Sequence, residues 1–393
     1  MALPRDLPGF YWDAERSRYF SGQRPPPQVT LQQKQTECQN TPPPSRISAS
    51  STARKQSTRL GSNVRGTEED IEWPSERGTL TAFCTAPDRQ FFGDNRSGIY
   101  SRSLEHVSDA AREWTPWSSD CYLAPDSPIS AITTTQTSTG TRCVAVCFGP
   151  KTKICLQDSP ERMFLLNLSS SRDVRCASLA GDSLALGAAR GVAYIEDIGT
   201  SMSGETLPTG SDVFAVAQKE SLIYAGTRGG AVLRFDTRVS SRSPKYQTIA
   251  ESTSSWSEEG KSVEASTTKS LRPLKDGRLL IVGFMDGRLG ALDMRFLRPH
   301  ARPALIYDGH ISSVSHQLGL TVDPTERFLF AAGGDNRVRG WSLYTSEAIH
   351  PFSEIVPVKN PLLELQFVQG NRVLWGAGVN SIWRWRLGED VGH

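Results

Sequence analysis

The sequence predicts an all-β fold, and three observations carry that prediction. From about residue 76 onward, short apolar runs alternate with Gly, Asp, Asn and Pro turns, without the sustained 3.6-residue period of helices. One pattern recurs along this region: an apolar strand, a pair of small residues, a turn and a second apolar strand. We count seven copies, about 40 to 50 residues apart. Four strands per unit at that spacing predict a seven-bladed β-propeller.

The clearest copy spans residues 309–344 and predicts three strands, within 312–322, 328–332 and 338–343, with turns at Asp323-Pro324 and at 333–336. The other six copies cover residues 79–103, 128–168, 173–198, 211–238, 267–296 and 360–387. The copy at 128–168 carries a polar insertion near 133–141. Linking segments such as 246–250, 304–307 and 348–352 would supply the fourth, outer strands.

The last copy ends too close to the end of the sequence to form an outer strand of its own. We therefore expect an N-terminal segment to pair there and close the ring, either residues 68–78 or the aromatic motif described next. Closure removes the exposed strand edges that would otherwise promote aggregation.

Residues 1–20 form a separate N-terminal aromatic motif. Two aromatic groups, Phe10-Tyr11-Trp12 and Tyr19-Phe20, flank a polar stretch that begins at Asp13, which suits a small hairpin. An isolated hairpin is only marginally stable in water, so these rings need another surface, either the chain's own large domain or a partner. Residues 21–75 are rich in Pro, Ser, Thr and Gln and predict a disordered linker, which places the propeller at 76–393.

Bulk composition argues against several function classes. The net charge of +2 gives no signal for nucleic acid or for an anionic membrane as a partner. No apolar run is long enough to span a bilayer, and the first residues lack the apolar region of a secretory signal. Seven cysteines without a CxxC pair predict reduced thiols. We expect a protein of the nucleus or cytoplasm, or both, that is not secreted.

Catalytic and metal-binding patterns are missing from the sequence. The six histidines stand in no metal-ligand spacing, and the Gly-rich run at 226–232 joins two strands rather than leading into a helix that could hold phosphate. We therefore expect no catalytic residue, no cofactor and no metal ion, and predict that the protein is not an enzyme. A propeller enzyme would need a polar central pocket lined by carboxylates or histidines.

The clearest copy resembles a WD repeat. Gly309-His310 stands at the Gly-His position of that family, Trp341 at the Trp of its Trp-Asp pair, and Asp335 six residues before it. The resemblance implies structural roles for His310, Asp335 and Trp341 in a buried hydrogen-bonded set. The family's strand hydroxyl is replaced by alanine, and Ser342 replaces the second residue of Trp-Asp.

The N-terminal motif, LPGFYWDAERSRYF, resembles that of the WD-repeat proteins known as cullin-4-associated factor 4. Members of that family are substrate receptors of a cullin-4 RING ubiquitin ligase and bind its propeller adaptor, damage-specific DNA-binding protein subunit 1. The resemblance implies that adaptor and a protein substrate as partners. It implies partner contacts for the aromatic motif, namely Phe10, Tyr11, Trp12, Asp13, Tyr19 and Phe20.

Receptors of this class often carry a WDxR box at the end of a blade's third strand, and two consecutive copies have a similar pattern. In the box that contains Asp236 and Arg238, Phe replaces the Trp. In the box that contains Asp293 and Arg295, Leu replaces it. A guanidinium at each position suits forked contacts with carboxylates or carbonyls of a partner. The alternative is that each Arg pairs with the Asp of its own turn.

The leading hypothesis is therefore a non-enzymatic protein-interaction module that acts as a ligase substrate receptor. The alternative is a scaffold subunit of a nuclear RNA-processing or chromatin complex without a ligase role.

Overall fold

The computed structural model describes residues 78–104, 117–125, 127–159, 162–200, 204–239, 246–252, 256, 264–297, 302–349, 358–368 and 373–387, and the backbone of three further strands at 10–13, 18–21 and 65–70. The chain divides into two compact units, Met1–Ser50 and Ser51–His393. In the first, β1 (Phe10–Asp13) pairs antiparallel with β2 (Arg18–Ser21), with Asp13 opposite Arg18. The expected hairpin is present.

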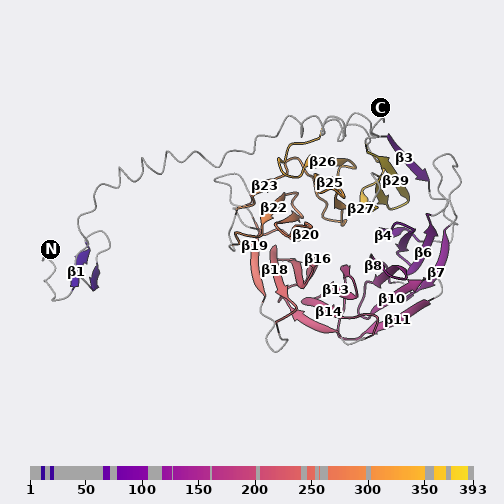
Figure 1. Cartoon of the computed structure of the whole chain (residues 1–393), viewed down its shortest axis with the longest axis horizontal. Coiled ribbons are helices and arrows are strands. Elements are labelled where there is room, and N and C mark those ends of the chain that lie inside the picture. Colours follow the sequence, from indigo (N-terminus) through magenta and orange to yellow (C-terminus); the bar gives the residue numbers. More distant parts are fainter. Residues whose placement is uncertain are drawn as a thin grey trace. The chain divides into compact units, whose positions relative to one another are not determined.

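The second unit is a ring of seven antiparallel sheets, so the predicted seven-bladed propeller is confirmed (Figure 1). Blade 1 is β4 (Leu80–Thr85), β5 (Arg89–Asp94), β6 (Gly98–Ser103) and β7 (Ser118–Tyr122). Blade 2 is β8 (Ile129–Thr137), β9 (Gly140–Cys147), β10 (Thr152–Ser159) and β11 (Arg162–Leu168). Blade 3 is β12 (Cys176–Ala180), β13 (Ser183–Ala188), β14 (Gly191–Ile195) and β15 (Glu205–Pro208).

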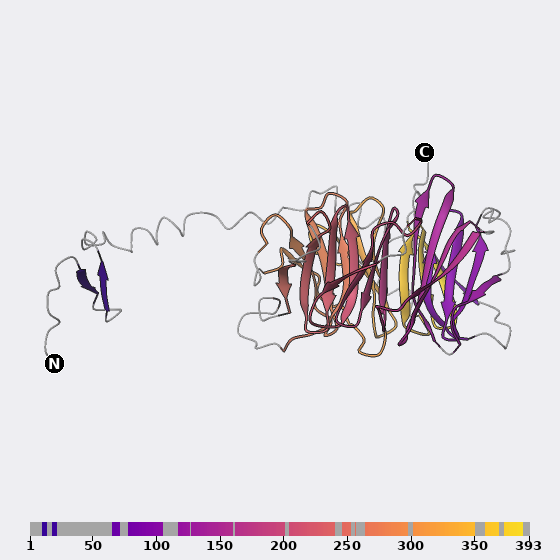
Figure 2. The ribbon, with the colours of Figure 1, turned by 90° about the horizontal axis from the view of Figure 1, so that it is seen from below.

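Blade 4 is β16 (Val213–Lys219), β17 (Leu222–Thr227), β18 (Ala231–Asp236) and β19 (Gln247–Glu251). Blade 5 is β20 (Thr268–Pro273), β21 (Leu279–Phe284), β22 (Leu289–Asp293) and β23 (Leu305–Ile306). Blade 6 is β24 (Leu320–Val322), β25 (Phe328–Ala332) and β26 (Val338–Ser342). Blade 7 is β27 (Leu362–Phe367), β28 (Val373–Gly378) and β29 (Ser381–Arg386), with β3 (Arg65–Asp70) at its outer edge. Seen from the side, the strands run between the two faces of the ring (Figure 2).

The ring closes through β3, which pairs with β29 from Ser381 opposite Asp70 to Arg386 opposite Arg65. Closure by an N-terminal segment was expected, but at 68–78 or through the aromatic motif. The strand lies at 65–70, inside the range expected to be a disordered linker, so the propeller starts before residue 76. Residues 21–64 and 71–77 of that expected linker lie outside the described residues.

Two blades differ from expectation. The polar stretch near 133–141 is no insertion, because it extends β8 and β9, with Thr133 opposite Val144 and Thr137 opposite Gly140. β-Branched threonines suit such strands. In blade 6, the first strand is only three residues long, and the expected outer strand is reduced to one bridge between Trp341 and Ala348. Residues 350–352 of that expected strand lie outside the described part.

Hydrophobic clusters fill the spaces between neighbouring blades. Among the described residues there are seven, and each joins two consecutive blades, blades 7 and 1 included. No blade is therefore packed by itself, because its apolar faces need both neighbours. The inner strands β4, β8, β12, β16, β20, β24 and β27 contribute residues to the wall of a central channel.

Candidate partner-binding surfaces

The two Asp–Arg turns of blades 4 and 5 have the same structure. Asp236 ends β18 opposite Leu222, and Asp293 ends β22 opposite Leu279. The preceding Phe235 and Leu292 are buried, which explains why another apolar residue can occupy the Trp position of the box. The buried Phe235 or Leu292 fixes the position of each turn. The aspartate at the strand end and the arginine two residues later project from the blade.

Each arginine forms a forked ion pair with the aspartate of its own turn. In both turns the arginine Nε lies 2.9 Å from the aspartate Oδ1 and the Nη2 lies 2.6 Å from the Oδ2. The arginine backbone N–H also donates to Oδ1, at 3.1 Å in Arg238 and 3.0 Å in Arg295. In the chain without a partner, each arginine therefore pairs with the aspartate of its own turn, as in the alternative interpretation.

This pairing leaves both arginines available to a partner. The side chain of Arg238 is 74% exposed and that of Arg295 is 58% exposed. A guanidinium has five N–H donors, and the fork uses two, so three remain free of this pairing and are held in a fixed orientation. Hydrogen bonding from Arg238 lowers the pKa of Asp236 to about 2, and Arg295 lowers the pKa of Asp293 in the same way.

An exposed apolar side chain follows each arginine. Val239 and Phe296 occupy equivalent places, and each backbone N–H donates 3.2 Å to the carbonyl of the turn aspartate. Phe296 is 71% exposed, and the Arg295 guanidinium carbon lies 5.5 Å from its ring centre. Two adjacent blades thus present the same combination of a pre-oriented cation and an apolar contact, which is the composition favoured in protein interfaces.

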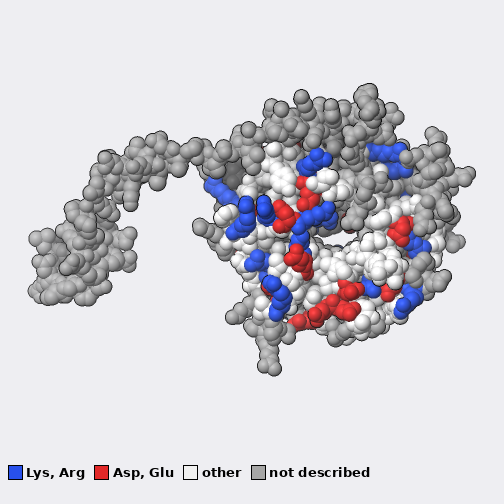
Figure 3. Space-filling model, in the orientation of Figure 1, with Lys and Arg blue, Asp and Glu red and all other residues white. Residues whose placement is uncertain are grey.

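Blade 6 has no such turn, although it carries the best-preserved repeat. Ser342 takes the aspartate position, opposite Phe328, and Tyr344 the arginine position. Figure 3 shows one face of the ring, where acidic and basic side chains are interspersed around the channel opening rather than separated by sign.

His310, Asp335 and Trp341 do not form one hydrogen-bonded set. The ring nitrogens of His310 lie 3.2 Å from the carbonyl oxygen of Gly287 and 3.3 Å from that of Ala332, and burial lowers its pKa. The Trp341 indole donates 3.0 Å to the Asp308 carbonyl. His310 and Trp341 are thus bound mainly to backbone.

Asp335 instead forms a forked ion pair with Arg339, at 2.8 and 2.7 Å. The three residues therefore hold the blade through separate contacts. For the aromatic motif, the structure gives the β1–β2 pairing only; the side chains of Phe10, Tyr11, Trp12, Asp13, Tyr19 and Phe20 lie outside the described residues.

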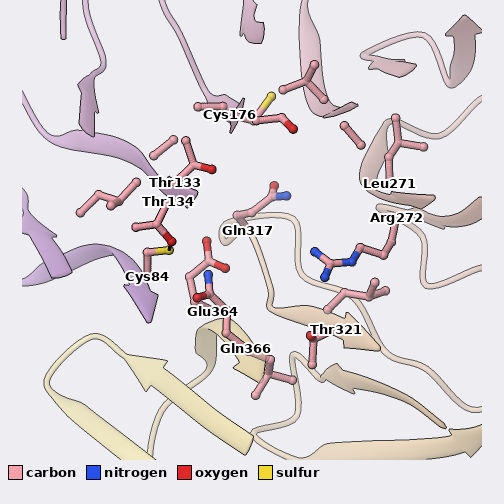
Figure 4. A pocket seen from close by; sticks show the side chains of 18 of the residues that line it. Cys84, Thr133, Thr134, Cys176, Leu271, Arg272, Gln317, Thr321, Glu364 and Gln366 are labelled. Carbon is pink, nitrogen blue, oxygen red and sulfur yellow. Dashed lines mark hydrogen bonds between the residues drawn. The ribbon is translucent and has the colours of Figure 1, made fainter. Parts of the chain in front are cut away.

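The central channel holds a feature that the sequence did not reveal. A cavity of about 720 Å³ is lined by all seven inner strands (Figure 4). In five blades the register of the inner strand against the second strand shifts at the same place. The inner strands of blades 3 and 6 can be aligned with these five through their pairing with β13 and β25. The equivalent positions are Ala82, Ala131, Cys176, Ala215, Ser270, Gly319 and Glu364.

Glu364 is the charged member of that otherwise small and neutral ring of positions. Two residues further along each strand are Cys84, Thr133, Ser178, Ala217, Arg272, Thr321 and Gln366. Arg272 is the charged member of this second ring. Figure 4 shows the side chains of Glu364 and Arg272 directed into the cavity from opposite sides.

A carboxylate inside an apolar strand, as in LLELQF, is the signal that could have identified Glu364. Its place in the channel, however, depends on the register of seven separate sheets. Glu364 lies beside Cys84, whose thiol hydrogen-bonds Thr134 at 3.3 Å, and near Gln366, which bonds the backbone of blade 1. Within the described part of the chain, the Glu364 side chain forms no hydrogen bond, and burial alone raises its pKa.

Two features are absent from the described residues, a metal-binding cluster and a membrane-spanning helix. No group of three or more His, Cys, Asp or Glu is placed there to hold a metal ion. No helix there combines the length and apolar character needed to cross a membrane.

Comparisons with known proteins show the fold. No protein-family model and no curated protein sequence matches the chain. Among solved structures, the chain is similar to a chain of the "Crystal Structure of Mitotic Checkpoint Complex", with a TM-score of 0.56 and 16% sequence identity over 83% of this chain and 94% of that one. At this identity the similarity supports the architecture alone. The protein is a seven-bladed β-propeller.

Proposed function

We propose that this chain is a substrate receptor of a cullin-4 RING ubiquitin ligase. The propeller fold suggests a protein–protein interaction module, and the proposal adds a specific partner, the ligase adaptor damage-specific DNA-binding protein subunit 1. Arg238 and Arg295 would contact the adaptor, and a protein substrate would bind elsewhere on the molecule. Nucleus, cytoplasm or both are the compartments that this role requires.

One observation carries the proposal: two adjacent blades repeat an exposed, pre-oriented arginine followed by an exposed apolar residue. An isolated surface ion pair adds little to the stability of a fold. The repetition of this pair in two adjacent blades therefore supports a role in recognition rather than in folding. The N-terminal aromatic motif supports the same partner through its sequence resemblance. The fold's similarity to a chain from a multiprotein complex supports protein partners in general.

The decisive experiment is co-precipitation of the adaptor with the full chain and with Arg238→Ala/Arg295→Ala. We expect the double variant to recover roughly tenfold less adaptor, because two charge-assisted contacts are lost. Arg238→Lys/Arg295→Lys should also weaken binding, since an ammonium cannot reproduce the forked geometry. Arg337→Ala is the matched control, because Arg337 is exposed but precedes β26 at the opposite end of a blade.

Each outcome of this assay has a distinct meaning. Equal recovery with wild type and the double alanine variant would remove the Asp–Arg turns from the proposal. No recovery with the wild-type chain would favour the alternative, a scaffold subunit in a nuclear RNA-processing or chromatin complex. Trp12→Ala in the same assay tests the aromatic motif, with reduced recovery expected.

A further inference from the structure

Two opposite charges face the central channel without neutralising one another. Glu364 comes from blade 7 and Arg272 from blade 5, with blade 6 between them. Their places in the register differ by two residues along the inner strands, which corresponds to roughly 6–7 Å of height in the channel. The ring positions equivalent to each are occupied by uncharged residues, so the charges stand out from the symmetry of the fold.

Neither charge has a partner within the described residues. Glu364 and Arg272 form no hydrogen bond or ion pair there, and the acid that acts on Arg272 through space is Glu326, near the end of the channel. Glu364 is partly buried and Arg272 is exposed, and both side chains reach the space of the channel. Desolvation inside the ring raises the pKa of Glu364 to about 8 and lowers the pKa of Arg272.

Such an arrangement favours a ligand that brings a partner to each side chain. A carboxyl group whose pKa is raised by burial ionises more readily when a cation lies beside it, and a guanidinium pairs readily with a carboxylate. The space itself is available, because the cavity measures about 720 Å³. Gln317, which precedes β24 of blade 6, lies between the two charged side chains and offers a polar group to a ligand (Figure 4).

We propose that the channel binds a ligand that carries a carboxylate and a cation, with the carboxylate on Arg272 and the cation on Glu364. A ligand with a single charge would leave one of the two protein charges unpaired, whereas a zwitterion satisfies both. Basic amino acids have this chemistry, with an α-carboxylate and a side-chain cation several ångströms apart. The source is either a free basic amino acid or the C-terminal Lys or Arg of a peptide. The site does not depend on the ligase role, because Arg238 and Arg295 lie outside the channel wall.

Calorimetric titration of the full chain with four probes tests the proposal. The probes are a neutral pentapeptide ending in lysine, its C-terminal amide, its analogue ending in norleucine, and free lysine. We expect the lysine peptide or free lysine to bind, and loss of either charge to weaken binding roughly tenfold or more. Binding of free lysine as tightly as the peptide identifies a small-molecule ligand; binding of the peptide alone identifies a chain end.

Two channel variants assign each ligand charge to its protein partner. Glu364→Gln should lose the preference for lysine over norleucine but keep the preference for carboxylate over amide. Arg272→Met should show the reverse. Glu220→Gln is the control, since the Glu220 side chain is 83% exposed outside the channel. A melting curve verifies that each variant is folded.

The proposal is overturned if no probe binds the folded wild-type chain at millimolar concentration. It is equally overturned if Glu364→Gln retains the full preference for lysine, or if Arg272→Met retains the full preference for the free carboxylate.

Discussion

The Asp–Arg turns and the central channel differ in whether their charged side chains are paired. In the turns of blades 4 and 5, each arginine meets its own aspartate two residues away, in water. In the channel, Glu364 and Arg272 come from different blades, remain apart and face one cavity inside the ring. In the turns, solvent and a neighbour stabilise both charges, whereas the side chains of Glu364 and Arg272 form no hydrogen bond or ion pair among the described residues. Paired surface charges can orient a contact, while two unpaired groups of opposite charge that face one cavity are available to a ligand.

Removal of the closing strand β3 should give the largest change in stability. A chain lacking residues 1–77 loses β3 and exposes the edge of β29, so we expect aggregation and a fall in the melting temperature of roughly 5–10 °C. Blade 7 would be destabilised although its described core contacts with blade 1 contain no β3 residue, while the turns of blades 4 and 5 would survive. Thermal unfolding and light scattering provide the measurement.

The control for this truncation lacks residues 1–50 and keeps β3. Its melting temperature should equal that of the full chain. Identical melting temperatures for the two truncations would contradict the closing role of β3.

The next largest effect concerns the pH dependence of stability, which reports on Glu364 in the channel. The pKa of Glu364 rises from its ordinary 4.5 to about 8, so the folded state binds more protons than the unfolded state between these values. Stability is therefore lost as pH rises through this window, by at most about 4–5 kcal/mol. Glu364→Gln should remove this loss, as measured by denaturant unfolding between pH 5 and 9.

Neighbouring groups do not obscure that test. The Cys84 thiol beside Glu364 has a pKa raised to about 11, above the window, and Arg272 remains protonated throughout it. Glu220→Gln should follow the wild-type profile. If Glu364→Gln did so too, Glu364 would not be an unpaired, partly buried acid.

The smallest expected effect concerns the exposed pair. Arg238→Ala should raise the pKa of Asp236 from about 2 toward its ordinary 3.8 without measurable change in stability at neutral pH. The pair contributes above the unfolded pKa and is lost as pH falls from about 4 toward 2. Carboxyl NMR titration measures both aspartates, and Asp293 serves as an internal control that should not move. An unchanged Asp236 pKa would show that the forked pair is absent in solution.

The sequence predicted local features well and long-range ones partly. Repeated apolar runs and turns gave seven blades, and the box positions lie at strand ends, as for Asp236 opposite Leu222. The closing strand was expected in the right region but at 68–78 rather than 65–70, because an acidic strand with little apolar pattern gives a weak signal. Threonines near 133–141 were interpreted as an insertion, since polarity outweighed their β propensity.

The repeat, the fold class and the two Asp–Arg turns could be predicted from the sequence, because each depends on residues within one blade. The folded ring was needed to show that Glu364 and Arg272 face one cavity and have no hydrogen-bonded partner among the described residues. They lie almost a hundred residues apart, and their relation follows from the register of separate sheets and the closure of the ring. Local patterns specify where side chains leave a strand, whereas the closed ring specifies which of them share one cavity.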